Sequence, residues 1–420
     1  MRARSCRRIG MGILIFLALG FRPSTRTQAQ KTPAKPAHAA PLSRPAQALP
    51  APHKLQKLYS VHFPVNAKYM FSVTGESCDA NGNLYLIFGV LHPIPGVPIG
   101  TPDLATLPVT RLGLNSQDMT KFRPQSFSGS QNYMPTKFTA DADGNLYWLF
   151  VPNSPALGRH QESLIVKYDS DGSYDSKIRL HAPRGMVLYV ASMTVFANGN
   201  YLVTGTLQPQ PPRRRKRIKP GAKIHFSHHI VYPKGLRPFT GIFDDQGDLI
   251  ATMRLPHDIS FPKEYKIHFQ PGRADSWSQS QIPTMMIDNT LIARGPADTA
   301  YLMRPANPPI LYTISDAGQL LHEVRVTAFT ASHLQPNQMN AMGQSRLLVQ
   351  YFHSSYNMNT HVNHSTTKYA VINVLTGKVE ADFLPAQGFG MAECAFGDDF
   401  ESLGKTHSGQ LEINVFSLGH

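Results

Sequence analysis

The sequence lacks several features that would each point to a specific class of protein. No long amphipathic helical pattern occurs in its 420 residues, which argues against a helical fold. The apolar run at residues 11–21 is too short for a membrane-spanning helix, which needs about 20 residues. Gly-x-Ser-x-Gly, His-Glu-x-x-His and a phosphate-binding Gly-rich loop before a helix are also missing. The sequence therefore gives no support for the catalytic chemistries that these motifs serve.

Acidic residues are scarce as well. There are 27 Asp and Glu residues against 41 Lys and Arg residues, which gives a net charge of +14. Part of this excess lies near the N-terminus, and another part lies in one Pro-flanked basic run: Arg213, Arg214, Arg215, Lys216 and Arg217. Such a run is either a solvated loop tip or a contact for an anionic surface, such as phospholipid headgroups or envelope polysaccharide. We expect no nucleic-acid partner.

What the sequence contains is repetition. Residues 79–88 read Asp-Ala-Asn-Gly-Asn-Leu-Tyr-Leu-Ile-Phe, and residues 141–150 read Asp-Ala-Asp-Gly-Asn-Leu-Tyr-Trp-Leu-Phe. The Gly supplies the left-handed backbone of a tight turn, and the alternating apolar residues fit a half-buried strand. A third copy at residues 196–203 keeps Gly199 but has Phe196 in place of the first Asp. Each copy predicts a β-hairpin, and the third shows that the turn does not require the acidic residue.

A second phrase, an apolar strand followed by a polar Gly-containing turn and another strand, alternates with the first. It occurs at residues 164–180, 240–255, 310–326 and 369–383. Joined, the two phrases form a four-stranded antiparallel meander, which is the blade of a β-propeller. The sequence thus predicts an all-β chain with a single propeller. The hairpins indicate six blades, at about 68–127, 133–182, 186–256, 284–328, 336–385 and 388–418. Five or seven blades are the alternatives.

The last predicted blade lacks a fourth strand, because residues 411–416 form its third strand and the sequence ends soon afterwards. Residues 55–63, Leu-Gln-Lys-Leu-Tyr-Ser-Val-His-Phe, have strand composition and precede the first blade. We predict that this N-terminal strand completes the last blade and closes the ring. Closure removes the open sheet edges on which other chains could pair.

The repeated hairpins, together with the turn Tyr-Asp-Ser-Asp-Gly at residues 168–172, resemble NHL-type six-bladed propellers. The resemblance is strong in the first two blades, partial in the third to fifth and weak in the last. It implies a fold and not an activity, because rings of this type serve as scaffolds, binding modules and a few enzymes.

Residues 1–29 read as a secretory signal, with a basic start, the apolar run at 11–21 and a small-residue cleavage site ending at Ala29. An uncleaved membrane anchor is the alternative. Residues 30–54 are rich in Ala, Pro and Lys and have too few large apolar side chains to fold, so we expect a disordered linker. The protein would be secreted or periplasmic. Its propeller domain would span residues 55–420, with insertions near 91–107, 208–237, 257–283 and 353–367.

Removal of the signal would leave two cysteines, Cys78 and Cys394. They hold comparable positions, each on a predicted innermost strand just ahead of a turn, in the first and last blades. In an exported ring whose ends meet, they either form a disulfide across the seam or remain two separate small buried residues.

Propellers bind ligands at the mouth of the central channel or across the loops on one face. The predicted innermost strands supply six channel candidates, a mixed polar set without a cluster of like ligands: Glu76, Lys137, Ser192, Arg294, Asn340 and Glu393. Long insertions in a compact domain tend to be functional or disordered. Among their residues, Trp277 would either stack on a ligand or pack beneath its loop.

The 18 histidines raise the question of a metal site. The tightest group is His225, His228 and His229, which would need a further ligand from elsewhere to hold zinc. We predict polar loop histidines and no metal. Asp79 and Asp141 precede turn glycines, where Asp is primarily a turn former, and their spacing does not match a calcium loop. We predict no cofactor.

The sequence therefore favours an exported, monomeric binding or scaffold module for a protein, peptide or glycan ligand over an enzyme. The alternative is a metal-dependent hydrolase or lyase, similar to lactonase-type propellers, with Ca²⁺ or Zn²⁺ in the channel. Only Glu76, Asn340 and Glu393 could supply ligands for such a metal from the predicted innermost strands.

Overall fold

The computed structural model describes most of the chain after its first 54 residues. The described ranges are 55–67, 70–79, 81–90, 107–125, 130–152, 162–210, 229–266, 273–275, 281–329, 333–357, 359–385 and 392–418. They belong to one compact unit, Ala51–His420. The predicted signal and linker lie outside them, as do most residues of the predicted insertions near 91–107 and 208–237. Within the described ranges, we find no helix with the length and apolar character needed to span a membrane.

The repeated phrase forms the first turn of three successive sheets. In the first two sheets it joins β2 (Met70–Cys78) to β3 (Leu84–Val90) and β6 (Tyr133–Ala140) to β7 (Leu146–Pro152). In the third it joins β10 (Met186–Val195) to β11 (Tyr201–Pro209). The turn glycines have φ values of 75°, 84° and 86°, a left-handed conformation that glycine adopts without steric cost. The predicted hairpins are confirmed.

Each hairpin continues into an antiparallel meander. The first three sheets are completed by β4 (Val109–Leu112) and β5 (Met119–Phe122), by β8 (Leu164–Tyr168) and β9 (Tyr174–Arg179), and by β13 (Arg237–Phe243) and β14 (Leu249–Thr252).

The fourth sheet contains β17 (Leu291–Arg294), β18 (Thr299–Arg304), β19 (Ile310–Ser315) and β20 (Leu320–Arg325). The fifth contains β21 (Gln335–Met342), β22 (Arg346–Asn357), β23 (Val362–Asn373) and β24 (Val379–Phe383). The sixth contains β25 (Ala392–Phe396), β26 (Asp399–Lys405), β27 (Gln410–Leu418) and β1 (Leu55–Asn66). The described residues thus form six four-stranded meanders.

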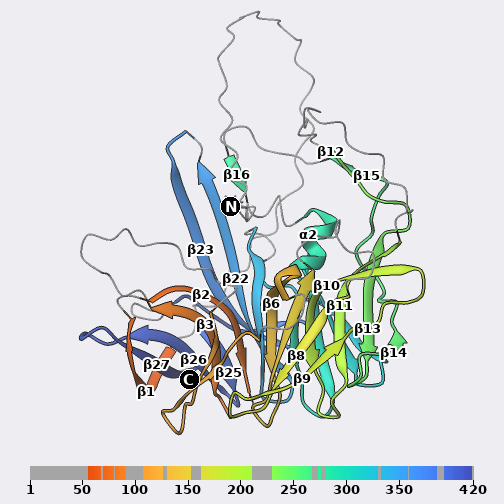
Figure 1. Cartoon of the computed structure of the whole chain (residues 1–420). Coiled ribbons are helices and arrows are strands. Elements are labelled where there is room, and N and C mark those ends of the chain that lie inside the picture. The colour runs from red at the N-terminus through yellow and green to blue at the C-terminus, as the bar shows by residue number, and fades with distance from the viewer. Residues whose placement is uncertain are drawn as a thin grey trace, which may run out of the picture. The chain divides into compact units, whose positions relative to one another are not determined.

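The sixth sheet joins the N-terminal strand to the C-terminal ones, as predicted. β1 pairs antiparallel with β27, from Leu55 opposite Leu418 to Asn66 opposite Gln410, and Figure 1 shows β1 beside β25, β26 and β27. The innermost strands contact one another in the order β2, β6, β10, β17, β21 and β25, and β25 contacts β2. The chain is therefore a closed β-propeller.

The hydrophobic core lies between neighbouring sheets. Each of six clusters of buried side chains is shared by two successive sheets, and the last of these pairs joins the sixth sheet to the first. Between the fifth and sixth sheets, for example, the rings of Tyr369, Phe383, Phe400 and Phe416 stack in series with centroid distances of 5.2, 5.1 and 6.4 Å. Burial between sheets is what holds such a ring together, because no single sheet can bury both of its faces alone.

Three features depart from the sequence prediction. The predicted fourth blade begins at residue 284, but the structure has a short helix there, α2 (Pro283–Asp288), with Pro in the first turn, where its missing N–H costs no hydrogen bond. Residues 353–357 and 362–367 continue the β22–β23 hairpin, although we expected an irregular insertion. The insertion at 257–283 contributes β15 (Glu264–Lys266), which pairs with β12 (His229–Val231), and β16 (Arg273–Asp275), which pairs with β22.

Candidate functional site

A cavity of about 1010 Å³ lies inside the ring of innermost strands. This volume is at the upper end of the range for pockets that hold small ligands. All six innermost strands contribute to its wall, with Ser77 from β2, Lys137 from β6, Ser192 from β10, Arg294 from β17, Asn340 from β21 and Ala395 from β25. The predicted central channel is therefore a real space and not a packed core.

Four of the six predicted channel residues line this cavity. Lys137, Ser192, Arg294 and Asn340 all belong to its wall. Glu76 and Glu393 lie on the innermost strands β2 and β25, as expected, but their side chains are not among those that the structure describes. The geometry of the cavity therefore rests on the first four residues.

Lys137 brings a cation into the cavity. Its side chain is solvent-accessible, but the surrounding walls desolvate it enough to lower its pKa, and Asp288 at the end of α2 opposes this shift. Burial likewise raises the pKa of Asp288, and Lys137 opposes that change. The two groups influence each other's pKa but form no direct ion pair in the described chain.

Arg294, at the end of β17, is the second cation of the wall. It is half-buried, and among the residues that the structure places it has neither a hydrogen bond nor an ion pair. A guanidinium has five N–H donors in a planar fork that matches a carboxylate or similar anion. Arg294 therefore offers its full donor set to the cavity.

The carboxylates Asp79 and Asp141 also belong to the wall, but their oxygens are already used. Asp79 accepts hydrogen bonds from the backbone N–H groups of Asn81 and Asn83 at 2.9 and 3.0 Å, from Asn83 Nδ2 at 2.7 Å and from the Tyr85 hydroxyl at 3.1 Å. Asp141 repeats this pattern in the second sheet. Both aspartates hold the turns of their own hairpins, in agreement with a structural role.

The rest of the wall is mostly uncharged. Thr194 is 2% exposed, and its hydroxyl has no hydrogen-bond partner in the described chain. Gln350 accepts a hydrogen bond from Asn337 Nδ2 at 2.8 Å and donates one to the Tyr369 hydroxyl at 3.0 Å, so the two amides at this position are held in fixed orientations. Hydroxyls and amides of this kind both donate and accept hydrogen bonds.

No protein-family model matches the sequence, and no curated protein matches it either. Among solved structures, BamB from Moraxella catarrhalis is similar over 87% of this chain and 100% of its own, with 8% identity and a TM-score of 0.37. An α-L-arabinanase from Penicillium chrysogenum, solved with arabinobiose, is similar over 87% of this chain and 99% of its own, with 11% identity and a TM-score of 0.36. Both are β-propellers. The resemblance to NHL-type propellers rests on the repeated turn sequences alone.

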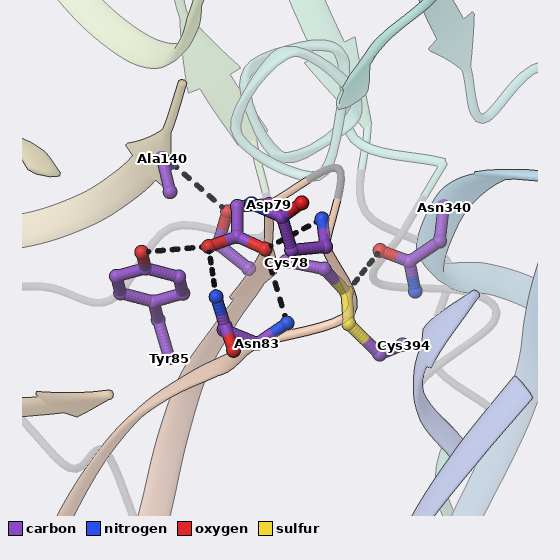
Figure 2. The surroundings of a disulfide bond; sticks show 9 residues. Cys78, Asp79, Asn83, Tyr85, Ala140, Asn340 and Cys394 are labelled. Carbon is purple, nitrogen blue, oxygen red and sulfur yellow. Dashed lines mark hydrogen bonds between the residues drawn. A yellow bond between two sulfur atoms is a disulfide. The ribbon is translucent and has the colours of Figure 1, made fainter. Parts of the chain in front are cut away.

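Cys78 and Cys394 form a disulfide next to the cavity, with Cα atoms 5.8 Å apart. This separation lies within the normal range for a disulfide. Figure 2 shows the bond between the Asp79 turn and Asn340, whose Oδ1 lies 3.9 Å from Cys78 Sγ. Because a disulfide sulfur carries no proton, we treat this approach as a contact and not as a hydrogen bond. The bond links β2 to β25, which are the innermost strands of the first and last sheets.

A buried arginine behind the wall was not predicted from the sequence. Arg304 on β18 is 1% exposed, and its guanidinium donates to both oxygens of Asp258 and to three threonine hydroxyls, those of Thr204, Thr240 and Thr290. Thr290 also lines the cavity. The sequence signal was an Arg at the end of a largely apolar strand, Thr299–Arg304. Its partners come from four other segments and could not be inferred.

The remaining predicted sites fall largely outside the described residues. This applies to Trp277, to the basic run 213–217, and to His225 and His228, and for His229 only the backbone in β12 is described. Within the described ranges, no three His, Cys, Asp or Glu side chains lie close enough together to hold a metal ion. Two of the three candidate ligands of a propeller hydrolase, Glu76 and Glu393, have side chains outside the described residues, so the metal-dependent alternative stays a prediction.

Proposed function

We propose that this protein is an exported binding module whose ligand, a protein segment, a peptide or a glycan, enters the central cavity. The observation that carries the proposal is the cavity itself, which is about 1010 Å³ and is lined by all six innermost strands. Fixed strands on every side would hold a bound ligand without the entropy cost of ordering flexible loops.

The chemistry of the wall supports binding. Two cations without ion-pair partners in the described chain, Lys137 and Arg294, line the same space, together with the exposed Asn337. Unused polar groups in a concave site are what orient a ligand and give specificity.

Export is supported by the disulfide between Cys78 and Cys394, since such bonds persist in oxidising compartments outside the cytoplasm. It agrees with the signal-like sequence of residues 1–29. Recovery of the mature protein from the cell envelope or medium, with an N-terminus near residue 30, would test this part. Recovery of the full-length chain from the cytoplasm would contradict it.

The binding function is tested by screening the mature protein against glycan and peptide arrays, in parallel with Asn337→Trp. Asn337 is an exposed residue of the cavity wall, so a Trp there should obstruct the cavity. Because it also removes the hydrogen bond to the buried Gln350, circular dichroism and the unfolding midpoint check that the variant is folded. The matched control is Asn363→Trp on the exposed part of β23, away from the wall.

We expect at least one ligand that binds the mature protein and the control but not Asn337→Trp. A ligand that binds all three proteins equally would place binding outside the cavity. Absence of binding on both arrays at millimolar concentration would also count against the proposal.

A further inference from the structure

The cavity wall carries two cations whose counter-charges are missing from the described chain. Lys137 and Arg294 come from different sheets, on β6 and β17, and both line the same space. Neither forms an ion pair with any described residue. The nearest acidic influence on Lys137 is Asp288 on α2, whose effect only partly offsets the desolvation of the ammonium group.

The carboxylates of the described wall do not neutralise these cations. Asp79 and Asp141 each accept four hydrogen bonds from their own turns. The third, Asp298, is exposed in the turn after β17 and forms no ion pair with Arg294. A partly desolvated cation without a partner is costly, and an anionic ligand would remove that cost.

The uncharged part of the wall favours a ligand rich in hydroxyl groups. Asn337 is exposed and Thr136 and Asn340 are half-buried in the wall, and the Asn337–Gln350 pair fixes two amides at one position. Hydroxyls and primary amides can pair with sugar hydroxyls as donors or as acceptors. An acidic peptide would supply carboxylates for the two cations but few hydroxyl groups for the uncharged part of the wall.

We propose that the ligand of the cavity is an anionic oligosaccharide, whose carboxylate or sulfate groups are bound by Lys137 and Arg294 and whose hydroxyls are bound by the uncharged wall. This inference rests on the proposed binding function and names its ligand class. Arg294 would bind one acidic group through two parallel N–H donors, and Lys137 would attract another as a point charge.

Isothermal titration calorimetry with defined probes tests the assignment. The probes are trigalacturonate, a sulfated oligosaccharide of similar length, neutral maltotriose and hexaglutamate. The variants are Lys137→Gln and Arg294→Gln, and the matched controls are Lys405→Gln and Arg237→Gln, which remove exposed cations that do not line the cavity. Lys137→Arg keeps the charge and should restore binding.

We expect one of the two anionic saccharides to bind, and each cavity variant to weaken that binding by about 10- to 100-fold, which is the range for losing a hydrogen bond to a charged group. Binding should fall with added salt, and the controls should behave as wild type. Unchanged circular dichroism and unfolding midpoints would show that the variants are folded.

Three results would overturn the assignment. The first is binding of maltotriose as tight as that of the acidic saccharides. The second is normal binding of the anionic saccharide by the cavity variants, and the third is binding of hexaglutamate alone. In each case the assigned ligand class is wrong. If the arrays also yield a ligand whose binding is lost in Asn337→Trp, the proposed binding function still stands. If no ligand sensitive to Asn337→Trp exists and no probe binds, both proposals fail.

Discussion

Two buried ionisable side chains lie between neighbouring sheets, and they differ in their hydrogen bonding. Arg304, between the third and fourth sheets, has an acceptor for each of its five N–H groups. Glu401, on β26 beside the seam between the first and last sheets, is fully buried, and neither of its carboxyl oxygens has a hydrogen-bond partner in the described chain. One interface thus contains a fully hydrogen-bonded guanidinium, Arg304, and the other contains a carboxyl group without hydrogen bonds in the described chain, Glu401.

The surroundings of Glu401 explain its state. In the register of β25 and β26 it lies opposite Cys394, and its Oε1 lies close to Gly82, where an added Cβ would be only 3.0 Å away. The Asp79 carboxylate influences Glu401, but its oxygens accept hydrogen bonds from its own hairpin. Burial raises the pKa of the Glu401 carboxyl well above its usual range, and the Asp79 carboxylate raises it further. A neutral acid is therefore the form that fits this seam.

The two interfaces therefore depend on different forces. The Arg304 interface depends on a buried ion pair whose partners must all be present. Among the described residues the seam has no buried ion pair, and the disulfide, the pairing of β1 with β27 and apolar packing hold it together. We therefore expect loss of one partner of Arg304 to destabilise the protein strongly. At the seam, we expect stability to depend on reduction of the disulfide and on pH.

The largest effect is expected from Asp258→Asn. The amide has one acceptor oxygen where the carboxylate has two, and the variant leaves the buried guanidinium of Arg304 without a counter-charge. The free energy of unfolding should fall by about 3–5 kcal/mol, measured by urea denaturation. Asp298→Asn, which changes an exposed carboxylate, is the control. A loss no larger than that of the control would mean that the arginine network contributes little to stability.

The second effect is expected at the seam, from the double variant Cys78→Ala with Cys394→Ala. The disulfide joins residues 316 apart in sequence, and removing a cross-link of this kind typically lowers the free energy of unfolding by about 2–4 kcal/mol. Urea unfolding of the wild-type protein with and without a reductant gives an independent measure. If reductant destabilises the double variant as much as the wild type, the loss does not come from this bond.

The smallest expected effect is the pH-dependent difference in stability between Glu401→Gln and the wild type. A carboxyl whose pKa is raised by folding binds its proton more tightly in the folded state. Its stabilising contribution is fully present below its unfolded pKa, about 4.3, and is lost as the pH rises toward the raised folded pKa. Gln mimics the protonated form at every pH.

We therefore expect Glu401→Gln to be more stable than the wild type at pH 7 by about 1–2 kcal/mol, and to converge with it near pH 4.5. Thermal unfolding across this pH range measures the difference, with Glu380→Gln as an exposed control. A difference that does not change with pH would show that Glu401 does not titrate between these values.

The sequence predicted much of the framework. The turn phrases around Gly82, Gly144 and Gly199 predicted three hairpins, and the strand composition of residues 55–63 predicted closure of the ring. These features depend on backbone dihedrals and local side-chain alternation, which are written within a few neighbouring residues. The inner-strand position of Lys137, Ser192, Arg294 and Asn340 followed from the same alternation.

The sequence did not predict α2, the extended β22–β23 hairpin or the Arg304 network. The end of the β22–β23 hairpin pairs locally, but its residues 353–367 are mostly polar and lack the apolar alternation that indicates a strand. For the Arg304 network the partners are distant in sequence. Asp258, for example, is a residue of what we took to be an irregular insertion, and it reaches Arg304 from 46 positions away. No periodicity in either segment encodes that contact.

By itself, the sequence determined where the chain turns, which residues alternate into strands and which two segments could meet to close the ring, because these properties are local. Only the tertiary structure decided which charges are paired. Arg304 has its five acceptors and Glu401 has none, while Lys137 and Arg294 face the cavity without an ion pair in the described chain. The reason is physical: the partner of a buried charge comes from another sheet, and sheets acquire their neighbours only when the ring closes.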